Sequence, residues 1–432
     1  MAAPPIPALR AIAAGLGAGT LTCVGIVEAL LARIAEREPA VQAWEFLDPA
    51  QALDAARRID REGPRGPLAG VPVGVKDIID THDMPTAYGS PLYAGHRPAR
   101  DASCVALVKR LGGLVLGKTV TTEFAYFGPG ATRNPHDASR TPGGSSSGSA
   151  AAVAAGMVPV AFGTQTAASI IRPASYCGVV GYKPSFGMLD RTGVRPFADS
   201  LDTLGALART VGDAAWLCFA LAGRPAPELS ADPGGFRIGV CRTHEWDHAA
   251  PESRAALETA AARLSAAGAR VTEVALPDPF RDLWRDQKRI MAVEGARACA
   301  PEMAMAPDRL SPPLRELIAL GEATTPAELD RSLDRAAAAR AAFPAVLDGL
   351  DALICPAAMG VAPPGVAATG DPIFSRVWTL LGVPSVAVPG CTGPQGLPVG
   401  VQVVGRFRDD ARVLAVAGLL ERALAGGVLP TG

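Results

Sequence analysis

Apolar residues recur at helical spacing close to the start of the chain and again in several later stretches. After Thr22, which is a candidate helix N-cap, Ile26, Leu30 and Ile34 fall on one face of a helix over residues 23–36. The same kind of spacing predicts further helices over 103–111, 150–156, 251–267, 326–347 and 410–425.

Short apolar runs bounded by glycine or proline predict strands between these helices. The run over 70–80 is rich in β-branched residues and alternates poorly, which is typical of a strand buried on both faces. Comparable runs predict strands over 114–117, 158–162, 236–241, 350–355, 383–388 and 398–404. Because strands and helices alternate along the chain, the pattern indicates an α/β fold.

The length of 432 residues leaves one large domain or two smaller domains open. The Pro/Gly-rich stretch over 224–235 is the best candidate for a linker. It is short, however, and it lies between elements that both resemble layers of one sheet. We therefore predict a single domain over residues 1–432.

Charge and composition exclude several classes of protein. The 41 basic and 42 acidic residues are spread along the chain, and no basic patch indicates a nucleic-acid partner. Residues 1–10 lack a basic segment followed by an apolar core, and Glu28 and Arg33 interrupt the apolar stretch over 11–34. We therefore expect neither a signal peptide nor a membrane partner. The eight dispersed cysteines are typical of a reduced, cytoplasmic protein, and the five histidines show no metal-ligand spacing.

The first of three segments with candidate chemistry contains Lys76. In the simplest interpretation its ammonium lies at the strand end and pairs with Asp77 or Asp80. If the lysine is instead buried without a carboxylate, its amine loses the proton more easily. A neutral amine is what a general base near pH 7 requires.

The second segment, over 142–150, is a Gly/Ser loop that contains Gly144 and Ser145 and runs directly into an Ala-rich helix. The third segment, over 163–173, places small residues before Ser169, so successive N–H groups can converge beside its hydroxyl as in an oxyanion site. Arg172 either orients an anionic substrate group or pairs with an acidic side chain.

Together these segments resemble the amidase signature family. Other stretches resemble it in the same order along the chain, namely 117–119, 123–124, 134–135, 200–205 and 396–402. The resemblance is weakest over 224–350, a mostly helical segment that we expect to shape the substrate pocket. The fold that we predict is a large mixed sheet covered by helices on both faces.

The resemblance implies a Ser–Ser–Lys triad without metal or cofactor. Ser169 would be the nucleophile, and Ser145 would relay its proton to neutral Lys76. The N–H groups of Thr166, Ala167, Ala168 and Ser169 would form the oxyanion hole. Substrate contacts are expected from Arg172, Gly144 and Gln165. The expected partner is a small-molecule amide, carbamate or urea-type substrate, and family analogy leaves a homodimer open.

The chain departs from the family pattern at three positions. Gln165 stands where the family commonly has Asp, and Ala167 and Ala168 stand where it commonly has Gly-Gly. An alanine methyl would strain the loop if either position required positive φ. The spacing of Arg172 after Ser169, together with Gln165, resembles the short bacterial malonamidase-like branch and favours a small or carboxylate-bearing amide.

Three other functions remain open from the residues. Residues 144–148 also fit GxSxG, with Ser146 as the nucleophile of an α/β-hydrolase esterase and His244 or His248 as its base. The Gly/Ser loop could instead cradle a phosphate in a non-catalytic nucleotide-binding module, although no GK[ST] follows it. Within the family, the amidase component of a tRNA-dependent amidotransferase is a further candidate. The modest length and the departures at Gln165, Ala167 and Ala168 argue against that role.

Overall fold

The computed structural model describes residues 8–229 and 235–426. Within these ranges one sheet of eleven strands has the order β1-β3-β2-β4-β6-β5-β10-β11-β9-β7-β8. The strands are β1 (Trp44–Phe46), β2 (Pro72–Lys76), β3 (Leu114–Thr119), β4 (Val160–Gln165), β5 (Val180–Lys183), β6 (Thr203–Ala208), β7 (Arg237–Cys241), β8 (Arg270–Val274), β9 (Ala352–Pro356), β10 (Ser385–Thr392) and β11 (Pro398–Val404).

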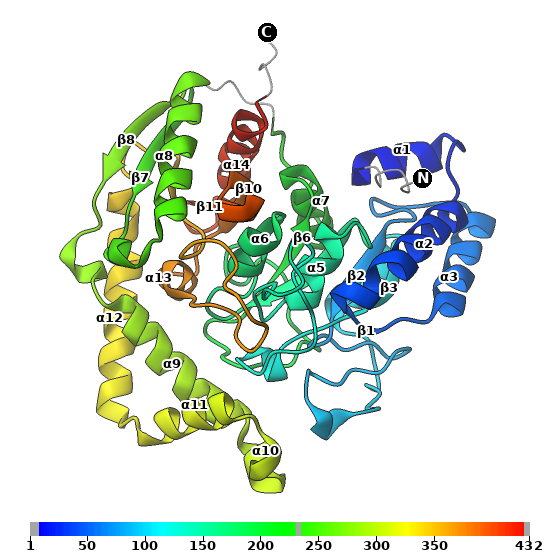
Figure 1. Ribbon diagram of the computed structural model, residues 1–432, viewed down its shortest axis with the longest axis horizontal. Coiled ribbons are helices and arrows are strands. Elements are labelled where there is room, and N and C mark those ends of the chain that lie inside the picture. Colours follow the sequence, from blue (N-terminus) through cyan, green and yellow to red (C-terminus); the bar gives the residue numbers. More distant parts are fainter. Residues whose placement is uncertain (1–7, 230–234, 427–432) are drawn as a thin grey trace.

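Both parallel and antiparallel pairs occur in the sheet, so the predicted mixed sheet is confirmed. Strand β2 runs parallel to β3 and β4, and β7 runs parallel to β8 and β9. The strands between these two groups pair antiparallel. Figure 1 shows helices covering both faces, as expected for this fold.

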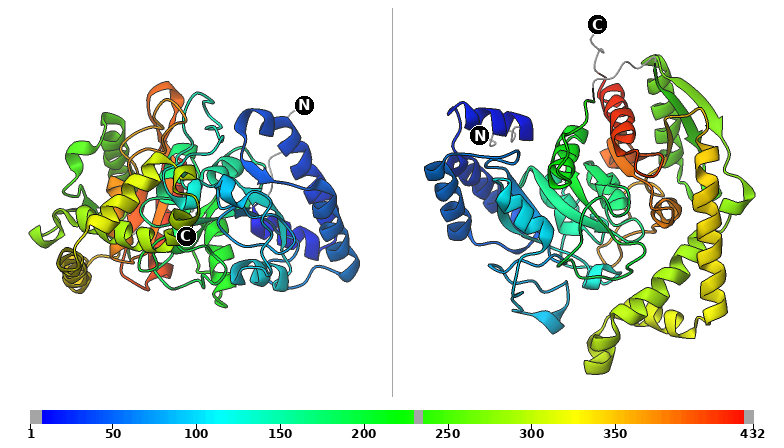
Figure 2. Two further views of the ribbon diagram at one scale, coloured as in Figure 1. Left: turned by 90° about the horizontal axis from the view of Figure 1, so that it is seen from below. Right: turned by 180° about the vertical axis from the view of Figure 1, so that it is seen from behind.

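The helices of the described residues fall into groups along the sheet. Figures 1 and 2 show α1–α3 at the end of the sheet formed by β1–β3, and α8–α12 toward the opposite end. Their bounds are α1 (Leu9–Gly17), α2 (Cys23–Val41), α3 (Pro49–Glu62), α4 (Ser103–Arg110), α5 (Ser147–Ala154), α6 (Ile171–Cys177), α7 (Val211–Leu221), α8 (Pro251–Ala266), α9 (Leu283–Ala298), α10 (Ala300–Met305), α11 (Pro312–Ala323), α12 (Pro326–Val346), α13 (Ile373–Leu380) and α14 (Asp410–Leu424). No helix in this part of the chain has both the length and the apolar character needed to cross a bilayer.

Most predicted elements are present with small differences at their ends. Thr22 caps α2 by accepting a hydrogen bond from the N–H of Gly25 at 3.0 Å. Helix α5 begins at Ser147, earlier than predicted, because the last part of the Gly/Ser loop is itself helical. Strand β2 ends at Lys76, because the chain turns there with the N–H of Ile79 donating to the carbonyl of Lys76.

Several elements give no strong pattern in the sequence. Strand β6 consists mainly of Ala, Gly and Leu, which carry little β propensity, and helices α9 and α13 were not predicted. Part of the predicted linker, residues 230–234, and residues 1–7 lie outside the described residues.

Candidate active site

The candidate catalytic residues come together at one edge of the sheet. Lys76 is the last residue of β2, and Ser169 follows the end of β4. Because β2 and β4 are parallel neighbours, their carboxyl ends lie at the same edge. Ser145 lies in the Gly/Ser loop just before α5, which packs against both strands.

Lys76 is buried and faces hydroxyl groups instead of carboxylates. Its Nζ lies 2.7 Å from Ser145 Oγ and 2.7 Å from Thr164 Oγ1. Burial lowers the pKa of Lys76 well below its ordinary value, against a smaller opposing effect of Asp202. Among the described residues no carboxylate lies within ion-pair distance of this amine. The neighbouring Asp77 pairs instead with Lys118, at 2.9 Å.

A small, narrow cavity opens beside the two serines. Ser145 and Ser169 both line it, and the N–H of Ser146 donates to the carbonyl of Ser169 at 3.3 Å. The rest of the wall is largely aromatic and apolar, and its residues are Ala125, Tyr126, Phe127, Thr166, Ala167, Arg172, Phe197, Met291, Thr369 and Pro372. The cavity therefore suits a small substrate with an apolar part.

The segment before Ser169 leaves main-chain donors unused. In the described part of the chain, the N–H groups of Ala167, Ala168 and Ser169 donate to no other protein group. Neither alanine has positive φ, so the methyl groups that replace the family's Gly-Gly cause no strain of that kind. Three free donors beside a serine hydroxyl can bind an oxyanion.

Neither Gln165 nor Gly144 is among the residues that line the cavity. The Oε1 of Gln165 accepts hydrogen bonds from the N–H groups of Ile170 and Ile171 at 2.9 and 3.0 Å. Its Nε2 donates to Thr379 Oγ1 at 3.0 Å, which a carboxylate at this position could not do. The side chain thus holds the turn that carries Ser169.

Arg172 lines the cavity and is also tied to main-chain carbonyls. Its guanidinium donates to the carbonyls of Gly370 and Gly144 at 2.5 and 2.7 Å and to Thr369 Oγ1 at 3.0 Å. Burial lowers the pKa of Arg172 to about 10, so the side chain remains charged near neutral pH. Within the described residues no carboxylate lies within ion-pair distance of this charge, and Asp371 acts on it from further away.

The structure adds residues that were not singled out from the sequence. Thr164 contacts the amine of Lys76, and Asp202 accepts a 2.5 Å hydrogen bond from Thr166 Oγ1. Thr164 and Asp202 both belong to segments that resemble the family, and this resemblance is the only feature of the sequence that could have indicated them. Gln287 of α9 and Thr379 of α13 also contact the oxyanion segment, but they lie where the sequence carries no motif.

The esterase alternative does not fit the geometry. Ser146 is fully buried outside the cavity wall, and its hydroxyl is engaged with the N–H and the carbonyl of Thr164 at 3.3 Å each. The chain before Ser146 is not a strand, which the GxSxG turn requires. His244 contacts the carbonyl of Pro277 at an exposed position. Ser146 is therefore not placed to act as a nucleophile.

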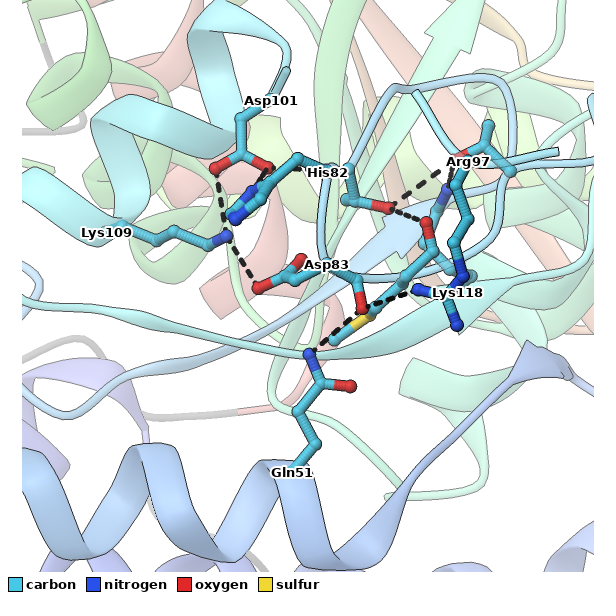
Figure 3. A network of polar contacts seen from close by, with 10 residues as sticks. Gln51, His82, Asp83, Arg97, Asp101, Lys109 and Lys118 are labelled. Carbon is cyan, nitrogen blue, oxygen red and sulfur yellow. Dashed lines mark hydrogen bonds and ion pairs between the residues drawn. The ribbon is translucent and has the colours of Figure 1, made fainter. Parts of the chain in front are cut away.

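One group of potential metal ligands lies near the surface, away from the serines. Figure 3 shows Lys109 Nζ between the carboxylates of Asp83 and Asp101, 2.9 Å from each, with His82 beside Asp101. The ammonium already supplies the positive charge that these carboxylates need.

The mixed sheet and a serine-lined cavity beside a buried lysine are typical of the amidase signature enzymes, which hydrolyse amide C–N bonds. A sequence profile of the family described as Amidase matches residues 25–414, and the chain belongs to this family.

Curated relatives and solved structures resemble the chain over nearly its whole length. A glutamyl-tRNA(Gln) amidotransferase subunit of Chloroflexus aggregans is 36% identical, with 94% of each chain covered. The corresponding protein of Acidothermus cellulolyticus is also 36% identical, with 95% of this chain and 93% of that protein covered. A crystal structure described as an amidase has a TM-score of 0.88 and 32% identity, covering 96% of this chain and 99% of the other. Peptide amidase from Stenotrophomonas maltophilia has a TM-score of 0.80 and 31% identity, covering 96% of each chain.

Proposed function

We propose that the protein hydrolyses the C–N bond of a small carboxamide, or a related carbamate or urea-type bond, through an acyl-enzyme on Ser169. The observation that carries this proposal is the 2.7 Å contact between the buried amine of Lys76 and Ser145 Oγ, beside a cavity that Ser169 also lines. A lysine without a carboxylate partner is placed to act as a base and not as a structural charge.

In the proposed mechanism the neutral amine of Lys76 takes the proton of Ser145 while Ser145 takes the proton of Ser169. Ser169 Oγ forms a bond to the carbonyl carbon of the substrate. The N–H groups of Thr166, Ala167, Ala168 and Ser169 bind the oxyanion. The C–N bond then breaks, and the proton returns through Ser145 to the leaving amine. Water hydrolyses the ester by the same proton path. None of these steps calls for a metal ion or cofactor, and we keep the prediction that none is used.

The finer substrate class that we propose is an amide that also bears a carboxylate. Arg172 places a positive charge at the cavity wall, and Asp371 is a carboxylate that acts on it only from beyond ion-pair distance. Because a buried charge without a close counter-ion is costly, a substrate carboxylate in the cavity would be stabilised there.

A matched substrate pair tests both parts of the proposal. We expect the purified protein to release ammonia from succinamate with a higher kcat/KM than from butyramide, which has the same length but lacks the charge. We expect Ser169→Ala to abolish turnover of both, and Ser145→Ala and Lys76→Ala each to reduce it by orders of magnitude. Full activity of the Ser169→Ala variant would refute the mechanism, whereas equal turnover of the two amides would refute only the substrate class.

A second candidate function follows from the curated relatives. They are subunits of a glutamyl-tRNA(Gln) amidotransferase, and the one from Chloroflexus aggregans is 36% identical over 94% of this chain. In that role the chain would work within an assembly that handles tRNA, contrary to the expectation of no nucleic-acid partner. Turnover of small amides by the isolated chain favours the amidase, and glutamine hydrolysis that appears only with further protein components favours the amidotransferase. A cytoplasmic location and a homodimer stay predictions.

A further inference from the structure

Two peptide groups of the oxyanion segment are anchored from outside the family's signature motifs. The carbonyl of Thr166 accepts a hydrogen bond from Gln287 Nε2 at 2.8 Å. The carbonyl of the next residue, Ala167, accepts one from Thr379 Oγ1 at 2.7 Å. Both donors are buried side chains, one on α9 and the other on α13.

These anchors determine where the neighbouring N–H groups point. A trans peptide group is planar, and its C=O and N–H point in opposite directions. The peptide that carries the Thr166 carbonyl also carries the N–H of Ala167, and the peptide of the Ala167 carbonyl carries the N–H of Ala168. Since each carbonyl is held by a helix on its far side, each N–H is directed away from that helix. These are two of the N–H groups that donate to no other protein group in the described part of the chain.

Each anchor is itself fixed by a second hydrogen bond. The Oε1 of Gln287 accepts a hydrogen bond from Arg376, so its amide has its Nε2 side toward Thr166. Arginine only donates hydrogen bonds, which leaves the Gln287 amide a single orientation. The hydroxyl of Thr379 accepts from Gln165 Nε2, which leaves its proton for the carbonyl of Ala167. Both donors are therefore in place before a substrate binds.

We propose that Gln287 and Thr379 are positioning residues that aim the N–H groups of Ala167 and Ala168 at the oxyanion of the tetrahedral intermediate. The inference rests on the proposed acyl-enzyme function and adds a task for the central segment, from which Gln287 comes. Preorganised donors act mainly in the transition state, where the negative charge develops, and less on the neutral carbonyl of the bound substrate.

The expected signature is a loss of kcat with little change in KM. Removing one oxyanion donor typically lowers kcat by about 10²–10³-fold, and a donor that is present but misdirected should cost less. We therefore expect about a 10–100-fold lower kcat for Thr379→Val, with KM changed by less than about 3-fold. Thr379→Ser keeps the hydroxyl and should restore most of kcat.

A matched control separates positioning from general loss of a buried hydroxyl. Thr132 is also buried, and its Oγ1 donates to the carbonyl of Gln42 at 2.7 Å, away from the cavity wall. Thr132→Val therefore makes the same chemical change at another place and should keep kcat near the wild-type value. Gln287→Met removes the other anchor and should reproduce the kcat loss of Thr379→Val, so the test does not depend on one variant folding.

The outcomes distinguish this inference from the proposed function. Wild-type kcat in both Thr379→Val and Gln287→Met, with Ser169→Ala inactive, would overturn the positioning role and leave the function intact. The same follows if Thr379→Ser fails to restore kcat, or if KM rises while kcat is unchanged. An active Ser169→Ala variant would overturn the function itself.

Discussion

At the scale of single residues, the chemistry depends on where Lys76 has been placed. Its amine is fully buried at the end of β2 and contacts two hydroxyl groups. The carboxylate whose charge opposes this effect, Asp202, is itself bound to Thr166 and to the main chain and does not pair with Lys76. Desolvation therefore dominates and favours the neutral amine, which is the form that can accept a proton.

The pH dependence of the reaction should report this neutral amine. As the pH falls through the pKa of Lys76 in the folded protein, the amine becomes protonated and can no longer act as a base, so kcat/KM should fall on the acid side. Because burial lowers that pKa well below its ordinary value, the activity should already be on its plateau at mildly alkaline pH. Rates measured from pH 5 to 10 check this expectation. A rate that rises as the solution is acidified would contradict it.

The same burial should cost the protein stability. An unfolded lysine has a pKa of about 10.4, so between the folded and the unfolded pKa the unfolded chain binds a proton that the folded chain does not. This loss of stability is absent above the pKa of Lys76 in the unfolded chain. It grows as the pH falls and levels off below the pKa of Lys76 in the folded protein. Lys76→Met should therefore gain free energy of unfolding relative to wild type as the pH is lowered from about 10. Urea unfolding of both proteins at several pH values measures this gain. A difference in the free energy of unfolding that does not change with pH would contradict the expectation.

Residue roles were predictable only where a motif carried them. The two serines, Lys76 and the oxyanion segment could be chosen because ordered motifs resemble a family. Thr164 lies in one of those motifs, but no pattern shows that its hydroxyl contacts an amine on another strand. Contacts of that kind depend on strand register, which short apolar runs do not specify.

At the scale of elements, the site depends on how closely α5 approaches the sheet. Gly148 lies in the first turn of α5, and a Cβ at this position would lie 2.3 Å from both the carbonyl oxygen of Ala43 and the nitrogen of Val120. These are backbone atoms that cannot move aside without shifting a strand. The small residues of the Gly/Ser loop therefore allow the helix, and Ser145 before it, to lie next to Lys76.

Substituting this glycine should damage both stability and activity. We expect Gly148→Ala to lower the free energy of unfolding by about 1–3 kcal/mol, because the added methyl overpacks the contact, and to lower kcat by displacing Ser145. Gly17→Ala is the control, since nothing lies within 4 Å of a Cβ there. Thermal unfolding and turnover of the two variants provide the comparison. Wild-type stability in Gly148→Ala would show that the approach is not as close as the structure indicates.

Some helices were predicted from their apolar spacing, and others, among them α3, were not. The long helix α12 has bounds close to those expected, whereas the capped helix α2 begins where predicted but continues beyond residue 36 to Val41. Helix α13 is only 8 residues long and buried throughout, so its sequence offers too few turns to establish a helical period. The two helices that were not predicted, α9 and α13, carry Gln287 and Thr379. The sequence therefore did not reveal that these two side chains hold the oxyanion segment.

At the scale of the whole molecule, the site combines residues from distant parts of the chain. Lys76 and the serines come from the first half, Met291 from the central helices, and Thr379 from close to the end. The mixed sheet with helices on both faces was predictable from alternation and family resemblance. The packing of α9 and α13 against the oxyanion segment was not, because long-range contacts leave no local pattern. The single domain stays a prediction.

The most direct measurement is labelling with a serine-reactive fluorophosphonate, with the modified peptide identified by mass spectrometry. We expect one adduct, on Ser169, formed much more slowly in Lys76→Ala and Ser145→Ala and absent in Ser169→Ala. An adduct on Ser146 or on a cysteine, or labelling that is equally fast without the lysine, would contradict the proposed proton path.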